Sequence, residues 1–392
     1  MSSREDDALL RARALVGPLR ARAGDTEARG GLPPETLADL VESGLFGLLE
    51  PARIGGAEAE FVALLDVTAE LARGDASVAW TYASVAARRW MVGMFAPAAQ
   101  DAVWAARGAV IASSFVFPGG QARRASGGWR LSGRWPFASG AADADWMMLG
   151  GVATLEQAIG EDADYRLFLL PRRDCAVLDT WRSAGLRGTG SHDVSVADAF
   201  VADAFSLGVH EVGGGPTPGG AVNSGPLWRL PAFALAPFTL AGVPLGNAQA
   251  CLEDFVSESR LRASRQNLAR MADYQSVQLR IASAAAQIDA ARLTLRAPCV
   301  EAMAMAREGR APDLRQKTRW RRDAAFAVGL CTQAVTQLVA AAGAGGLPAD
   351  GAPQRRFRDA HAAAAHIDFN FDVAGAHYGR VVLGLPSENP VL

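Results

Sequence analysis

A histidine near the carboxyl end of the chain stands at a fixed distance from an arginine–aspartate pair. Arg358-Asp359 is followed seven positions later by His366, and the sequence then reaches Gly379-Arg-Val-Val-Leu-Gly. A neutral imidazole can donate a hydrogen bond to a ligand oxygen or shuttle a proton near pH 7, where histidine titrates. By residue type alone, a helix histidine that meets a polar partner in the core is the simpler interpretation.

Three serines lie in predicted strands or at their ends. Ser139 closes Trp135-Pro-Phe-Ala-Ser-Gly, and the glycine after it would let the backbone approach a planar ring. A turn serine that bonds its own backbone is the alternative. Ser113 and Ser114 interrupt an apolar strand, and its alternation sends them to opposite faces, so only one of them can face a pocket.

Two arginines and a tryptophan have types that suit ligand binding. Trp80 and Arg88 are eight residues apart on one predicted helix, which puts them within about a quarter turn of each other. The guanidinium of Arg88 suits an anionic or carbonyl-bearing substrate, whereas a helix tryptophan is more often part of a core. Arg262 precedes a long helical pattern and can bind a phosphate or lie on a solvated face beside Arg260.

The sequence excludes several classes of protein. It contains no HExxH motif, P-loop or Ser-His-Asp arrangement, and His361 and His366 are five residues apart, so no metal site is expected. The formal net charge of -2, without a long block of one sign, argues against nucleic-acid binding. Four dispersed cysteines and a charged start without a signal core predict a cytoplasmic protein. Residues 230–252 are apolar but contain three prolines, which favours a buried helix over a membrane span.

The elements that must position these residues fall into three predicted domains. Half of the 392 residues are hydrophobic, so the chain can bury a large core. Helical periodicity predicts an N-terminal helical domain over residues 1–107, and short strand-like runs predict a β domain over residues 108–212. Long periodic segments in residues 213–392 predict a C-terminal four-helix bundle. The Gly-Leu-Arg-Gly-Thr-Gly-Ser-His segment that begins at Gly185 is interpreted as turn chemistry.

This order of domains resembles the acyl-CoA dehydrogenase superfamily over nearly the whole chain. The stretches that carry the resemblance are GDASVAW, GGWRLSGRWPFASGAADADW, GLRGTGSHDVSVADAFV, DYQSVQLRIASAAAQIDAAR and FRDA. The fold class that it implies is mostly α with a central β-barrel or sandwich domain. Two motifs of the dehydrogenases are missing: the glutamate of an I-Y-E-G-T-type segment after Arg-Asp-Ala, and R-x-x-F-G before the long bundle helix.

The carboxyl end instead resembles the oxygenase components of two-component flavin monooxygenases. That group has Arg-Asp, a histidine seven positions on and a terminal G-x-x-x-L-G, as here. The resemblance implies reduced FMN from a separate flavin reductase (FAD is an option), molecular oxygen, a flavin C(4a)-hydroperoxide and a homotetramer. The product would be a hydroxylated or N-oxygenated small aromatic, polyketide or amine.

The resemblance also assigns roles to residues of this chain. His366 and Ser139 would be catalytic, and Ser139 would also bind the flavin, together with Trp80, Ser113, Trp135 and Arg262. Ser114, Arg88 and Arg229 would bind the substrate. Phenol-hydroxylating relatives carry a histidine where this chain has Arg88, which argues against phenol ortho-hydroxylation.

Two alternatives remain open at this stage. One is an FAD-dependent dehydrogenase of acyl thioesters, for which Asp368 is the only nearby carboxylate base. The other is a non-enzymatic scaffold that keeps the fold without the chemistry.

Overall fold

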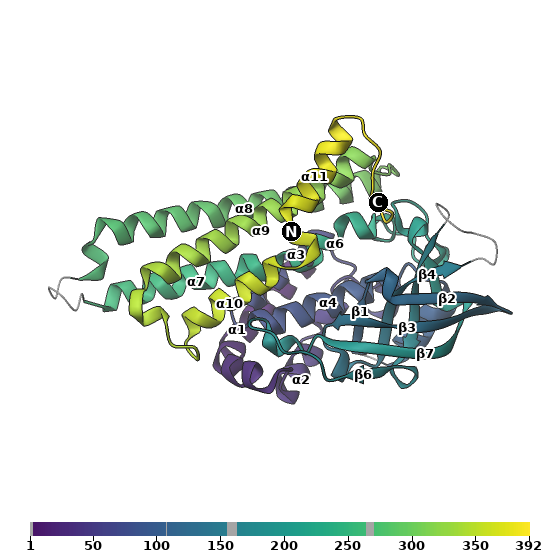
Figure 1. Ribbon diagram of the computed structural model, residues 1–392, viewed down its shortest axis with the longest axis horizontal. Coiled ribbons are helices and arrows are strands. Elements are labelled where there is room, and N and C mark those ends of the chain that lie inside the picture. The colour runs from purple at the N-terminus through teal and green to yellow at the C-terminus, as the bar shows by residue number, and fades with distance from the viewer. Residues whose placement is uncertain (1–2, 107, 155–162, 264–269) are drawn as a thin grey trace.

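The structure, a computed structural model, describes residues 3–106, 108–154, 163–263 and 270–392. A helical bundle extends to one side of the molecule, a twisted sheet lies on the other, and the N-terminal helices lie between and below them (Figure 1). This arrangement confirms the expected fold class, with helices before and after a central β domain.

The N-terminal part contains five helices, and the fourth of them is buried along its whole length. Asp75 caps this helix, because its Oδ1 accepts from the backbone N of Ser77 at 2.7 Å and of Val78 at 3.1 Å. Helix α4 carries both Trp80 and Arg88 into the interior. The helices are α1 (Ser3–Arg29), α2 (Pro34–Glu42), α3 (Phe61–Ala72), α4 (Ala76–Val92) and α5 (Pro97–Trp104).

The central part is one eight-stranded, mostly antiparallel sheet. Its order is β6-β7-β3-β2-β4-β5-β8, and β1 pairs with β4 in parallel. Strand β3 ends at the turn that carries Ser139, and β1 packs against α4, so the sheet brings its serines to the buried helix. The strands are β1 (Ile111–Ser114), β2 (Gly120–Ala125), β3 (Gly128–Ala138), β4 (Trp146–Thr154), β5 (Asp164–Pro171), β6 (Ala176–Leu178), β7 (His192–Ala202) and β8 (Ser206–Gly208).

The C-terminal part is a bundle of α7, α8, α9 and α10. The longest helix, α8, has 33 residues and is about 50 Å long at 1.5 Å per residue. Its long periodic pattern runs through Pro298 without ending the helix. The helices are α6 (Ala232–Leu240), α7 (Gly242–Leu261), α8 (Gln275–Arg307), α9 (Leu314–Ala341), α10 (Ala352–Ala364) and α11 (Phe371–Val382).

The three parts share one continuous hydrophobic core. Helix α5 ends at Trp104 and β1 begins at Ile111, while the last strand ends at Gly208. The apolar residues 230–252 form α6 and part of α7 and are mostly buried. Among the described helices, α9 alone is long and apolar enough to cross a membrane by length and composition, and half of its most apolar stretch is buried in the protein.

Candidate active site

A chain of buried hydroxyl groups starts at the indole of Trp80. Trp80 Nε1 donates to Ser139 Oγ at 3.1 Å, and Ser139 Oγ lies 2.8 Å from Ser191 Oγ. Ser191 Oγ is 2.7 Å from Thr189 Oγ1, which donates to the carbonyl oxygen of Leu186 at 2.9 Å. We call Ser139, Ser191 and Thr189 the hydroxyl chain.

The direction of every bond in the hydroxyl chain follows from counting protons. Thr189 has a single hydroxyl proton and gives it to the Leu186 carbonyl, which can only accept. Ser191 must then donate to Thr189, and Ser139 must donate to Ser191. Ser139 is left with oxygen lone pairs alone for a ligand, so it acts there as a hydrogen-bond acceptor.

His366 lies against the same tryptophan. Its ring centre is 5.5 Å from that of Trp80, with the rings inclined by 65°. His366 Nδ1 accepts from the backbone N of Asp368 at 3.2 Å, which puts the proton of the neutral ring on Nε2. The Nε2–H group has no partner within the described residues, and the side chain is 35% exposed, so this donor is available to a ligand.

Two charged groups set the titration of His366. Asp368 Oδ1 accepts from Arg321 Nη2 at 2.6 Å, and Asp368 Oδ2 is 3.8 Å from His366 Nδ1. Burial, together with repulsion from Arg321 and Arg88, lowers the pKa of His366, although Asp368 opposes this. Burial acts to raise the pKa of Asp368, but the charges of Arg321, His366 and Arg88 and the hydrogen bond from Arg321 together lower that pKa. The site therefore holds a neutral imidazole and an ionised carboxylate at neutral pH.

Arg88 lies beside this group without a close carboxylate. Its guanidinium carbon is 4.5 Å from the centre of the Phe115 ring, and its Nη1 contacts Met91 Sδ at 3.1 Å. The side chain is 8% exposed. The electrostatic interaction of Arg88 with Asp368 connects Arg88 to the His366 site.

The two serines of β1 differ in their surroundings. Ser114 is buried and its Oγ donates to the carbonyl oxygen of Pro136 at 2.7 Å, so it adjoins the end of β3 just before the hydroxyl chain. Ser113 is half-buried and faces the opposite side of the strand, paired in register with Met148. No contact among the described residues joins Ser113 to His366 or Trp80.

Three residues predicted for the site lie elsewhere: Trp135, Arg229 and Arg262. Trp135 has no exposed surface, and its Nε1 donates to the carbonyl oxygen of Gly150 at 2.6 Å; it is a core residue, which corrects the expectation of a flavin contact. Arg229 is exposed at the end of a short helix and has no side-chain partner among the described residues. The structure does not bring Arg229 to the substrate side of the site.

Arg262 is also remote from Trp80 within one chain. Arg262 follows the last residue of α7. This end of α7 is at the end of the bundle that points away from the sheet (Figure 1). There its Nη1 lies 3.0 Å from the point where a β-carbon of Gly345 would be, against the Gly343–Gly346 turn. Arg262 and this glycine turn therefore lie together, but outside the site built by α4 and β3.

The sequence analysis missed Ser191, Thr189 and Arg321. The first two belong to the segment interpreted as turn chemistry, and the structure shows how that segment is held. Asp359 Oδ1 accepts from the backbone N of Leu186 at 2.6 Å. At Gly185 a β-carbon would lie 2.1 Å from the Arg358 carbonyl oxygen, so only glycine allows this approach. The two sequence motifs are thus in direct contact.

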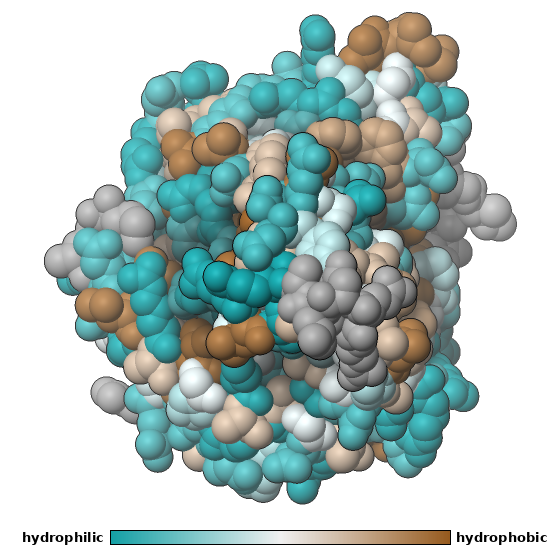
Figure 2. Space-filling view, turned by 90° about the vertical axis from the view of Figure 1, so that its left-hand side faces the viewer, coloured by the Kyte–Doolittle hydropathy of each residue, from teal (hydrophilic) through white to brown (hydrophobic). Residues whose placement is uncertain are grey.

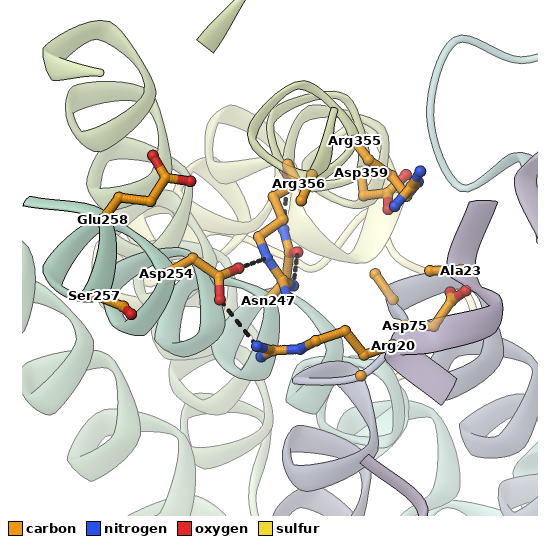
Figure 3. Close-up of a pocket in the computed structure, with 13 residues that line it drawn as sticks. Arg20, Ala23, Asp75, Asn247, Asp254, Ser257, Glu258, Arg355, Arg356 and Asp359 are labelled. Carbon is orange, nitrogen blue, oxygen red and sulfur yellow. Dashed lines mark hydrogen bonds and ion pairs between the residues drawn. The ribbon is translucent and has the colours of Figure 1, made fainter. Parts of the chain in front are cut away.

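A separate polar cavity of about 290 Å³ lies between α1, α4, α7 and α10 (Figure 3). Asp254 accepts there from Arg356 Nε at 2.8 Å and from Arg20 Nη1 at 3.0 Å. Burial raises the pKa of Asp75 to about 6 and that of Asp359 to about 7. Because its arginines and carboxylates are largely bonded to one another, this cavity is an ionic network that joins helices. Within the described residues no group of histidines, cysteines and carboxylates could hold a metal ion.

Comparison with known proteins defines the class to which this fold and site belong. The models of the acyl-CoA dehydrogenase N-terminal and C-terminal domains match residues 12–109 and 238–371. The crystal structure of 3-HSA hydroxylase from Rhodococcus sp. RHA1 matches with a TM-score of 0.93 and 30% identity, over 98% of this chain and 99% of that chain. XiaF from Streptomyces sp., in complex with FADH2 and glycerol, matches with a TM-score of 0.89 and 28% identity, over 99% of this chain and 98% of that chain.

A curated relative narrows the class. The oxygenase component of FADH(2)-dependent resorcinol hydroxylase from Rhizobium sp. (strain MTP-10005) is 33% identical over 381 residues, which cover 93% of this chain and 91% of the relative. This chain belongs to the oxygenase components of two-component flavin-dependent monooxygenases, and it is an oxidoreductase with the acyl-CoA dehydrogenase fold.

Proposed function

We propose that this enzyme binds reduced flavin at Trp80, Ser139 and His366 and inserts one atom of O2 into a small aromatic substrate. The observation that carries the proposal is a group made by a buried indole, a buried acceptor hydroxyl and a partly exposed neutral imidazole whose Nε2–H has no partner among the described residues. When bound, reduced flavin supplies the electrons that activate O2 and, as its C(4a)-hydroperoxide, the oxygen atom to be transferred.

The residues present fit a reduced flavin. Position N5 of reduced flavin carries a proton, and Ser139 offers a lone pair because its own proton is given to Ser191. Such a bond would hold the N5 proton in place and slow the loss of peroxide. At Gly140, φ is 71° and the position of a β-carbon lies 3.1 Å from Thr81 Cγ2, so the turn after Ser139 requires glycine.

His366 would supply the mobile proton. Its Nε2–H can donate to an oxygen held beside Trp80, and its lowered pKa keeps the ring neutral at pH 7. Burial of Trp80 and Ser139 limits the access of water, which would otherwise promote release of hydrogen peroxide.

The alternative acyl-thioester dehydrogenase lacks a suitable base. Asp368, the nearest carboxylate to His366, is bonded to Arg321 and has a lowered pKa. A carboxylate stabilised in this way is a weak base for the α-proton of a thioester. The relatives that match most of the chain are hydroxylases, which agrees with this conclusion.

The choice between FMN and FAD is open to a direct comparison. The absence of R-x-x-F-G predicts FMN, while the resorcinol hydroxylase relative and XiaF are named with FADH2. We propose that Arg262 and the Gly343–Gly346 turn bind a flavin phosphate of a neighbouring copy, because they meet at the far end of the bundle.

The test is anaerobic mixing of the protein with reduced FMN or FADH2, followed by oxygen in a stopped-flow spectrometer. We expect the transient absorbance of a flavin–oxygen adduct with at least one of the two flavins. A protein that instead purifies with tightly bound oxidised FAD and reduces it with acyl-CoA would contradict the proposal.

An assembly and a partner accompany this function. The two-component class implies a flavin reductase as the source of reduced flavin. We propose a homotetramer, supported by exposed apolar residues along α8: Leu279, Leu293 and Val300, which are separated by multiples of seven residues and lie on one face. Hydrophobic patches also interrupt the hydrophilic end of the molecule (Figure 2).

Four unpaired, buried cysteines support a cytoplasmic location.

A further inference from the structure

Among the described residues, Arg88 makes no ion pair, in contrast to its neighbour Arg89. Its neighbour Arg89 is 4% exposed and is paired with Glu50 Oε1 at 2.5 Å. Arg88 is 8% exposed, and within the described residues no carboxylate oxygen lies within 4.0 Å of it. The fold thus pairs the buried guanidinium of Arg89 with a carboxylate and leaves that of Arg88 without an ion pair among the described residues.

The charges around Arg88 do not balance. The groups that interact with it and with each other are Arg88, Arg321, Asp368 and the neutral His366. Two cations and one anion leave a net charge of +1 in a largely buried site. Asp368 is already bonded to Arg321 at 2.6 Å. The stacking of Arg88 on Phe115 stabilises the cation by less than the cost of burying an ion.

One edge of the Arg88 guanidinium is unused. Nη1 contacts the thioether of Met91, whereas Nε is buried without a partner and Nη2 has none among the described residues. The Nε and Nη2 protons lie on one edge and point in parallel, as two-point binding of a carboxylate requires. A buried donor without a partner destabilises the fold, and an acceptor on a ligand would remove that cost.

Phe115, the ring on which Arg88 stacks, belongs to a cluster of aromatic side chains. Phe115 lies 5.7 Å from Phe233 and 6.4 Å from Phe117 between ring centres, and Phe117 lies 5.4 Å from Tyr165. The second cation adjoins the same rings, since Arg321 Nη1 donates to the Phe233 carbonyl oxygen at 2.7 Å. Aromatic walls with a single unpaired cation favour a planar ring that carries one negative group.

We propose that Arg88 binds the carboxylate of an aromatic acid and is the residue that selects the substrate. This inference rests on the proposed function and adds the substrate class to it. Arg88 follows Trp80 by two helical turns, about 12 Å along the axis of α4. His366 contacts Trp80 and is affected by the charge of Arg88, so a ring anchored at Arg88 would lie toward His366.

The test compares acids with their neutral esters on the flavin-free protein. The probes are 3-hydroxybenzoate, 4-hydroxyphenylacetate and indole-3-carboxylate, each beside its methyl ester, with dissociation constants from isothermal titration calorimetry. We expect at least one acid to bind about tenfold or more tightly than its ester, which corresponds to about 1.4 kcal/mol. Arg88→Met should reduce the ratio to about one, and Arg88→Lys should give an intermediate value. The control Arg315→Met removes an exposed cation of α9 and should leave the ratio unchanged.

Thermal unfolding separates a binding role from a structural one. Removal of an unpaired buried cation should keep or raise the melting temperature of Arg88→Met, whereas a structural arginine would lower it. Equal binding of all acids and esters to the wild-type protein, or an acid preference that persists in Arg88→Met, would overturn the inference. These measurements use no flavin, so their failure is distinct from the absence of the oxygen-dependent transient that would refute the proposed function.

Discussion

At the residue scale, the site depends on which atom of each side chain carries a proton. Ser139 donates to Ser191 and can only accept from a ligand, while His366 keeps its proton on Nε2. Neither assignment follows from residue type, because a serine hydroxyl and a neutral imidazole can each both donate and accept. The backbone groups at the ends of these bonds, the Leu186 carbonyl and the Asp368 N–H, determine both.

Substitution of Ser191 by alanine tests the direction of the hydroxyl chain. Without Ser191, the Ser139 proton loses its acceptor and can rotate toward the ligand, so Ser139 no longer acts only as an acceptor. We expect the flavin adduct to lose hydrogen peroxide about 2–10 times faster, the equivalent of one hydrogen bond. Stopped-flow absorbance measures the lifetime, and Ser257→Ala, an exposed serine of α7, is the control. An unchanged lifetime in Ser191→Ala would contradict the assignment.

Opposite changes at Arg321 and Asp368 should move the titration of His366 in opposite directions. Arg321→Met removes a repelling cation and frees Asp368, so the pKa of His366 should rise. Asp368→Asn removes the attracting anion, so the same pKa should fall further. As the pH is lowered, the His366 imidazole should therefore become protonated at a higher pH in Arg321→Met and at a lower pH in Asp368→Asn. Titration of the histidine resonances by NMR, with His366→Asn for assignment, measures both shifts; shifts of the same sign would refute the electrostatic account.

At the element scale, the segment Leu186–Ser191 connects the bundle to the site. It receives Asp359 from α10 at one end and supplies Thr189 and Ser191 to the hydroxyl chain at the other. Asp359 belongs to the Arg-Asp pair by which the sequence resembles its family. Its role is to hold this segment, since burial raises its pKa to about 7 and it makes no contact with His366 among the described residues.

Asp359→Asn should alter the pH dependence of stability. A carboxyl group whose pKa rises from 3.8 to about 7 on folding binds more protons in the folded state, so its contribution to the free energy of unfolding decreases as the pH rises from about 4 to about 7. Asparagine keeps an acceptor for Leu186 N and removes this decrease. We expect the variant to be more stable than the wild type at pH 8 and to lose that advantage near pH 4. Urea unfolding at both pH values, at one protein concentration, measures the difference.

Asp359→Ala separates the charge from the hydrogen bond. Alanine leaves the buried Leu186 N without its acceptor, which should cost about 1–3 kcal/mol at every pH. A pH-independent difference between Asp359→Asn and the wild type would show that the carboxyl group is ionised in both states and would contradict the raised pKa.

Periodicity and turn chemistry predict the elements well but not the contacts between them. The long helical segments of the bundle and the change from helices to strands follow from local patterns. Arg321 could not be found in this way, because it stands 47 positions before Asp368 in the sequence, and only the packed bundle brings the two together. Trp135 stands only four positions before Ser139 in the sequence, but it does not share the site. Strand alternation turns its ring into the core.

At the scale of the whole molecule, the residues proposed to bind flavin do not all lie together within one chain. Trp80 belongs to α4 and Ser139 follows the end of β3, whereas Arg262 follows α7 at the end of the bundle away from the sheet (Figure 1). The exposed leucines of α8 provide a surface on which a second copy can pack. A tetramer would thus both bury these side chains and complete the flavin site.

Leu293→Glu tests whether assembly and flavin binding are linked. Leu293 is 72% exposed in a single chain, so the substitution should not disturb folding, but it would place a charge in an apolar interface between copies. We expect light scattering to show dissociation and fluorescence titration to show flavin affinity at least about tenfold weaker, because Arg262 would no longer reach the phosphate of a neighbour. Arg262→Met should weaken flavin binding without dissociation, and Leu10→Glu, at a leucine of α1 that is 61% exposed, should change neither. A dissociated Leu293→Glu protein that binds flavin as tightly as the wild type would show that each chain binds flavin by itself.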